Sequence, residues 1–170
     1  FMANWKWIIL LAAWALGIVL RPLIQFGLRK IKEYNLFAKK FPKSFIAYAF
    51  KCELERPLAW ILVILFWFGV NDGLELSGKF LTYYEHLLRA LMAIQLMRLA
   101  YYGVDALGGV FTDIAARTEN TMDDYLVPFA NKTLKILVVV LGLLLVLQSF
   151  GLNVMSLMAG LGLGGLALAL

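Results

Sequence analysis

Long apolar runs constrain this sequence more than any other feature. Five of them approach the roughly 20 residues that a helix needs to cross about 30 Å of hydrocarbon. In chain order they are Trp5 to about Leu28, Pro57 to Val70, Phe80 to Leu107, Thr133 to Phe150, and Val154 to Leu170. Hydrophobic residues make up 62% of the 170 residues, which is more than a soluble domain of this size can bury. The sequence therefore predicts an all-α membrane protein with five transmembrane helices per chain.

Three of these runs have special boundaries. The run from Pro57 to Val70 is short, so we expect its helix either to begin upstream near Phe45 or to lie in a thinned bilayer. Only residues 151–153 separate the last two runs, which predicts a tight antiparallel helical hairpin. The final run continues to Leu170, so we expect the sequence to be a piece of a longer protein.

Basic residues gather in the connection between residues 29 and 56, where lysines and arginines outnumber the acids. Such a connection is expected in the cytoplasm, which places the amino end outside the cell (inner) membrane and the carboxyl end inside. Within it, the stretch FAKKFPKSF alternates phenylalanines with Lys39, Lys40 and Lys43. These lysines are either a topology signal alone or also a contact with anionic lipid headgroups.

Residues that could form a catalytic or metal-binding site are few. One cysteine and one histidine leave no group with metal-ligand spacing, and no nucleophile has a base nearby in the sequence. We therefore expect no enzyme activity, no cofactor, no metal and no nucleic-acid partner. His86 is interpreted as an interfacial polar residue rather than a proton relay, and Glu85 should pair with Arg89 one helical turn away. Six aromatic residues mostly lie where interfacial anchors are expected: Trp5, Trp7, Trp60, Trp67, Tyr83 and Tyr84.

The last run is unusual because four of its final twelve residues are glycine, which a helix tolerates poorly. On a helical wheel of about 100° per residue, leucines form a front stripe and a back stripe, with small residues on both flanks. The front stripe holds Leu163, Leu166 and Leu170, and the back holds Leu157, Leu161 and Leu168. One flank holds Gly160, Gly164 and Ala167, and the other holds Gly162, Gly165 and Ala169.

Two small-residue flanks favour two close neighbours, as in a closed ring of identical helices. Ordinary close packing between helices of one chain is the alternative. If the leucine stripe faced the axis of a ring, Leu166 and Leu170 would form two apolar rings one turn apart, with Leu163 also facing the pore. Water tends to leave such a constriction, so these rings would act as a gate.

Three stretches resemble the MscS-like small-conductance mechanosensitive channels: DDYLVP from Asp123 to Pro128, the hairpin from Leu134 to Gly162, and the final GLGGLALAL. The resemblance implies a homoheptamer whose last helix lines the pore, with Leu166 and Leu170 closing it. It also implies opening by membrane tension and release of ions and small solutes on hypo-osmotic shock. Ala169 stands where many members of this family have glycine.

The chain is therefore expected to have two regions. Residues 1–119 would form three outer helices that sense lipid and tension, and residues 120–170 would form the hairpin that ends in the pore helix. Its partners would be membrane lipids, identical copies of the chain and permeating ions. Three alternatives stay open. They are a cyclic-nucleotide-gated relative of the same family, a secondary transporter, and a purely structural or regulatory membrane subunit. A transporter needs polar groups at the bilayer midplane, and Gln95 and Gln148 are too few to build a convincing site.

Overall fold

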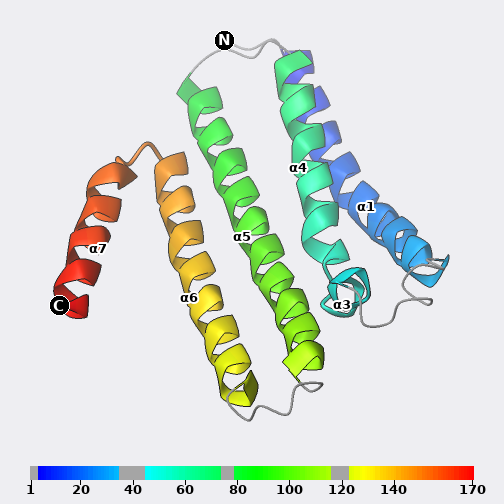
Figure 1. The fold of residues 1–170 in the computed structure, drawn as a ribbon. Coiled ribbons are helices and arrows are strands. Elements are labelled where there is room, and N and C mark those ends of the chain that lie inside the picture. The colour runs from blue at the N-terminus through cyan, green and yellow to red at the C-terminus, as the bar shows by residue number, and fades with distance from the viewer. Residues whose placement is uncertain (1–3, 35–44, 74–78, 116–122) are drawn as a thin grey trace.

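The computed structural model describes residues 4–34, 45–73, 79–115 and 123–170, and every element within them is a helix (Figure 1). The helices are α1 (Asn4–Tyr34), α3 (Phe45–Lys51), α4 (Glu55–Gly73), α5 (Lys79–Ala115), α6 (Asp123–Ser149) and α7 (Val154–Ala169). The prediction of an all-α chain is thus confirmed. Each of the five apolar runs lies in a separate one of these helices, and the fourth and fifth runs extend one residue past the end of α6 and α7.

The second run is where the expected boundaries differ most. One predicted alternative, a single helix beginning near Phe45, is wrong, because a short helix α3 ends at Lys51 and α4 begins separately at Glu55. Glu53 separates the two helices in the left-handed region, with φ of 56°. Pro57 then lies in the first turn of α4, where its missing N–H group costs nothing.

Two helices are long and apolar enough to cross a membrane by length and composition, among the residues that the structure describes. They contain the candidate spans Trp5–Lys30 in α1 and Tyr125–Ser149 in α6. The apolar part of α7, Val154–Ala167, is shorter. Five membrane-spanning helices therefore remain a prediction, whereas an apolar helical bundle is observed.

The long helices alternate in direction (Figure 1). The α6–α7 turn lies at the same end of the bundle as the start of α1, and α3 lies at the opposite end with the end of α5. In order across the bundle, α7 lies beside α6, α6 beside α5, and α4 beside α5 with α1 packed on α4. The antiparallel pair α5–α6 has the most extensive packing, whereas α7 contacts α6 sparsely.

Aromatic side chains join α1, α4 and α5. The ring of Trp14 stacks on that of Trp67 with centroids 4.3 Å apart, and its Nε1 donates to the Tyr84 hydroxyl at 3.0 Å. The Nε1 of Trp67 donates to the carbonyl oxygen of Ala13 at 3.0 Å. Trp67 is only 2% exposed and Tyr84 8%. The prediction that these two are interfacial anchors is therefore wrong, since both lie in the core of the bundle.

Helix α3 is fixed to the last part of α5. The Tyr48 hydroxyl donates to Asp113 Oδ2 at 2.5 Å, and the Tyr48 ring lies so close to Gly109 that a Cβ there would overlap it. The hydrogen bond to Asp113 stabilises the protonated phenol, so the pKa of Tyr48 is raised. This contact attaches the connection between α1 and α4 to α5.

Candidate pore helix and the hairpin that carries it

Local sequence determines where α7 begins. Asn153 is its N-cap residue, and the Asn153 side chain accepts a hydrogen bond from the Met155 backbone N–H at 3.0 Å. Such a cap satisfies one of the amide groups that the first turn of a helix leaves unpaired. The Ser156 hydroxyl also donates to the Asn153 carbonyl oxygen at 3.2 Å. The predicted tight hairpin is confirmed, because only residues 150–153 separate α6 from α7.

The leucines assigned to the gate lie exposed on α7. Leu163 is 71% exposed, Leu166 is 63% exposed, and Leu170 is fully exposed at the end of the chain. The backbone remains helical up to this point, since the Leu170 amide donates to the Leu166 carbonyl oxygen at 3.2 Å. The chain itself therefore does not bury this leucine stripe.

The four glycines of α7 do not serve close packing within the described chain. A Cβ added at Gly160, Gly162, Gly164 or Gly165 would meet no other atom within 4 Å. Ala167 and Ala169 are exposed in the same way. Elsewhere in the chain glycines do mark close approaches, because a Cβ at Gly17 or Gly142 would overlap a neighbouring side chain. The small residues of α7 are therefore available to a neighbour outside the chain.

The back of α7 faces α6 across an apolar groove of about 460 Å³. Helix α7 contributes Met158, Leu161 and Gly162 to this groove, opposite Thr133, Ile136, Leu137, Val140, Leu141 and Leu144 of α6. Leu161 was expected on the face opposite the leucine stripe, and it lies on the side of α6. Of the two predicted small flanks, the one with Gly162 borders this groove.

Helix α6 is fixed to α5 by paired contacts along its length. Lys135 forms an ion pair with Asp105 and lies 4.8 Å from the centre of the Tyr101 ring. Farther along, Gly142 lies against the side chain of Met97. Since these contacts follow one antiparallel register, α5 and α6 form a continuous two-helix layer beside α7.

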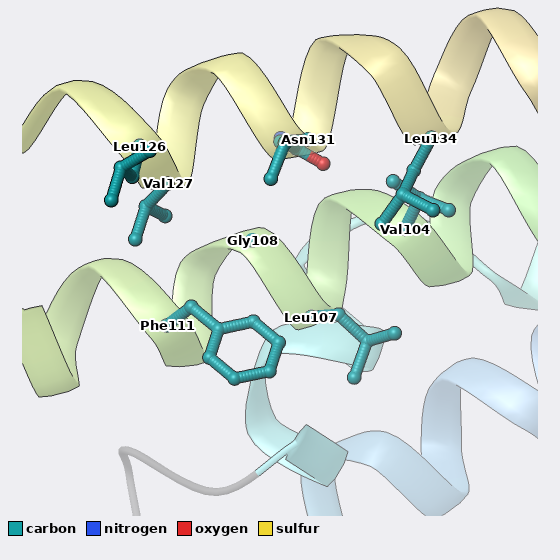
Figure 2. Close-up of a pocket in the computed structure, with 9 residues that line it drawn as sticks. Val104, Leu107, Gly108, Phe111, Leu126, Val127, Asn131 and Leu134 are labelled. Carbon is teal, nitrogen blue, oxygen red and sulfur yellow. The ribbon is translucent and has the colours of Figure 1, made fainter. Parts of the chain in front are cut away.

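Asn131 of α6 lies directly over Gly108 of α5, where a Cβ would overlap it (Figure 2). Around this contact is an apolar groove of about 250 Å³, which Leu107, Phe111 and Leu126 help to line. The Oδ1 atom of Asn131 is buried without a hydrogen-bond partner among the described residues. Gly108 therefore leaves the space that the Asn131 side chain occupies between the two helices.

The remaining predicted residues have different outcomes. Glu85 and Arg89 form the expected ion pair, at 3.3 Å. Lys39, Lys40 and Lys43 lie outside the described residues. Gln95 is buried on α5, whereas Gln148 lines a groove that contains Arg89 and not Gln95, so the two glutamines do not form one polar site there.

Several structural contacts were missed by sequence reasoning. The ion pair Asp105–Lys135 could have been predicted from the sequence. Each of its members is a rare charge within or beside an apolar run, where such charges tend to pair. The hydrogen bond between Tyr48 and Asp113 has no signal in the sequence, because the two residues are 65 positions apart and belong to different elements. No group of three or more His, Cys, Asp or Glu side chains that could hold a metal occurs among the described residues.

The last two helices are similar to a known protein family. Residues 132–170 match the family model described as mechanosensitive ion channel, transmembrane helices 2/3. This range contains most of α6, the α6–α7 turn and all of α7. The chain is a relative of the MscS-like mechanosensitive channels.

Three individual proteins extend this MscS-like relationship. The small-conductance mechanosensitive channel MscMJ of Methanocaldococcus jannaschii is 39% identical over 74 residues, which are 41% of this chain and 21% of MscMJ. The uncharacterized MscS family protein YhdY of Bacillus subtilis is 30% identical over 168 residues, covering 91% of this chain and 43% of YhdY. The large-conductance channel MscMJLR of M. jannaschii is 44% identical over 57 residues, covering 34% of this chain and 16% of MscMJLR.

The chain spans less than half the length of these relatives. The match to YhdY includes most of the chain, so the MscS-like relationship is not restricted to the hairpin. No solved structure matches the chain significantly.

Proposed function

We propose that this chain is the membrane region of a tension-gated ion channel in which α7 lines the pore. The observation that supports this most strongly is α7 itself. It is apolar, it packs only sparsely on its own chain, and its glycines have open space beside them. A helix with these properties needs partners outside the chain, and the family match includes its whole length.

The partners in this proposal are identical copies of the chain. Small residues allow helix backbones to approach closely in a membrane, where lipid supplies no hydrophobic driving force between helices. The flanks with Gly160, Gly164 and Ala167 and with Gly162, Gly165 and Ala169 would meet between neighbouring copies of α7. Seven copies is the stoichiometry that the resemblance to MscS-like channels implies.

In such a ring Leu166 and Leu170 close the pore, and Leu163 faces it. A narrow ring of leucine offers water no hydrogen-bond partner, so the constriction empties and blocks ions. Tension favours the state with the larger in-plane area, because the work done by the membrane grows with that area. Opening would move the leucine rings apart, let water in, and release ions and small solutes on hypo-osmotic shock.

The rest of the chain would connect lipid to this pore. We assign residues 1–119 to lipid and tension sensing and residues 120–170 to the pore hairpin. The chain would lie in the cell (inner) membrane with its amino end outside. Lys39, Lys40 and Lys43 would then contact the anionic headgroups on the cytoplasmic side.

Reconstitution of the full-length protein in liposomes tests this proposal. Native mass spectrometry should show an assembly of seven chains, and excised patches should pass current only when suction stretches the membrane. A monomer or simple dimer in lipid would contradict the ring. The absence of tension-dependent current from an intact heptamer would contradict the channel.

A further inference from the structure

The carboxyl end of α6 is built as a Schellman motif. The Gly151 amide donates to the Gln148 carbonyl oxygen at 2.9 Å, and the Leu152 amide donates to the Leu147 carbonyl oxygen at 3.4 Å. Gly151 has φ of 83°, the left-handed conformation that this motif requires and that glycine adopts at no steric cost. The motif satisfies two carbonyl groups and leaves that of Ser149 without a donor from its own helix.

The missing donor comes from α5. Nδ1 of His86 lies 2.6 Å from the Ser149 carbonyl oxygen, across a separation of 63 residues in the sequence. A carbonyl oxygen can only accept, so the imidazole must carry its proton on Nδ1 and donate it. The carbonyl oxygen of Val146, three residues before Ser149, accepts from the Ser149 hydroxyl at 2.6 Å. Each carbonyl from Val146 to Ser149 therefore has a donor.

The contact between His86 and Ser149 lies next to the turn from which α7 starts. Helix α7 packs sparsely on the rest of the chain, so its position is determined mainly by the turn from which it starts. The turn is specified on one side by the Asn153 cap of α7 and on the other by the end of α6. The His86 side chain joins this end of α6 to α5 through its contact with the Ser149 carbonyl oxygen.

We propose that His86 is a positioning residue of the pore helix, which caps α6 through Nδ1 and so holds the α6–α7 hairpin against α5. This role goes beyond the general lipid-sensing assignment of the outer helices, and only its consequence for opening rests on the proposed channel function. The contact connects α5 to the start of α7 without passing through the sparse α6–α7 packing.

Hydrogen exchange of the full-length protein in nanodiscs tests the cap without requiring any current. Replacing His86 by Ala should speed exchange of the Gly151 and Leu152 amides roughly threefold to tenfold, the factor that corresponds to one lost hydrogen bond. His86→Asn should restore slow exchange, because its side-chain amide offers a donor near the position of Nδ1. The matched control is Leu87→Ala on the same turn of α5, which should leave both amides unchanged.

Nitrogen-15 spectra of histidine-labelled protein, with the His86 signals assigned by their loss in His86→Asn, add a second readout. With the imidazole neutral, Nδ1 should be the protonated nitrogen, and it should remain so in Ser149→Ala because the acceptor is the backbone carbonyl. Protonation at Nε2 instead, or unchanged exchange in His86→Ala, would overturn the cap.

Patch recordings then test the consequence for opening. His86→Ala should shift the tension threshold and His86→Asn should restore it. Equal thresholds in the two variants and the parent would overturn the positioning role even if the cap is present. If the parent passes no current at all, the proposed channel function fails, whereas the exchange result still decides the cap.

Discussion

Among single residues, Gly17 marks a very close approach between α1 and α4. A Cβ at Gly17 would overlap the indole of Trp67, whereas a Cβ at Gly27 on the same helix would meet nothing. Gly17→Ala should therefore overpack the crossing and cost about 1–3 kcal/mol of stability. Gly27→Ala should be neutral or stabilising by up to ~1 kcal/mol, because alanine favours helix. Thermal unfolding in detergent compares the two, and equal melting temperatures would contradict this packing.

Cys52, in the turn between α3 and α4, provides a prediction about pH. Burial, followed by the negative charge of Asp105, raises the pKa of the Cys52 thiol, although Lys135 and Lys51 act in the opposite direction. Because the thiolate is the reactive form, maleimide should label Cys52 severalfold more slowly at pH 8 than an exposed thiol. Labelling should speed up only as pH rises above the ordinary thiol range.

The control thiol is Asp72→Cys, at an exposed position near the end of α4, in a Cys52→Ser background. The direction of this pKa shift also determines how the folding stability of the protein depends on pH. A raised pKa favours the protonated thiol in the folded state, so its contribution is present below the ordinary thiol pKa and is lost as pH rises through the raised value. Equal labelling profiles for the two thiols would contradict the partly buried environment of Cys52.

Some residue roles could not be predicted from the sequence. Trp67 and Tyr84 lie near the ends of apolar runs, where an interfacial anchor and a core aromatic have the same sequence pattern. Only the neighbouring helices distinguish them, since Trp14 contacts both. Glu85 and Arg89 could be predicted because both belong to one helix, where residues four apart are neighbours by geometry.

At the level of elements, α7 provides the clearest test of the proposed ring. Gly164→Leu places a branched side chain where the backbone of a neighbouring copy should lie, and overpacking of this kind costs roughly 1–3 kcal/mol at each site. The loss is repeated in every subunit. Native mass spectrometry should therefore show failed assembly, or patch recordings an altered tension threshold.

Gly69→Leu on α4 is the control for Gly164→Leu. A Cβ at Gly69 also has open space beside it, but α4 is not assigned to the ring. Assembly and threshold should stay normal in this variant. If Gly164→Leu behaves in the same way, that flank of α7 faces lipid rather than a neighbour.

The long elements were predictable because their apolar runs are continuous, and the hairpin was predictable because only three residues interrupt two such runs. The short helix α3 was not. Its FIAYAFK sequence follows a basic stretch, and it is stabilised by Tyr48 and Asp113 across two elements. Helix α5 extends to Ala115 rather than Leu107, because its last turns are held by α3 and α6 and not by apolarity alone.

For the whole molecule, the α5–α6 layer lies between the α1–α4 pair on one side and α7 on the other (Figure 1). The predicted boundary at residues 119 and 120 falls between α5 and α6, which are the most extensively packed helices. In the proposed channel, a change in the outer helices would therefore reach α7 through this layer and the hairpin. The number of copies and the orientation of the leucine stripe are properties of an assembly, and one sequence read alone does not determine them.

The most direct test of the central claim is the tension threshold of serine variants on opposite faces of α7, measured in liposome patches of the full-length protein. Leu166→Ser and Leu170→Ser should each lower the threshold, because a wider and more polar ring keeps water in the constriction. Leu161→Ser adds the same hydroxyl on the face that borders α6, and it should leave the threshold near that of the parent. An unchanged threshold in both gate variants, with a lowered one in Leu161→Ser, would contradict a pore lined by this leucine stripe.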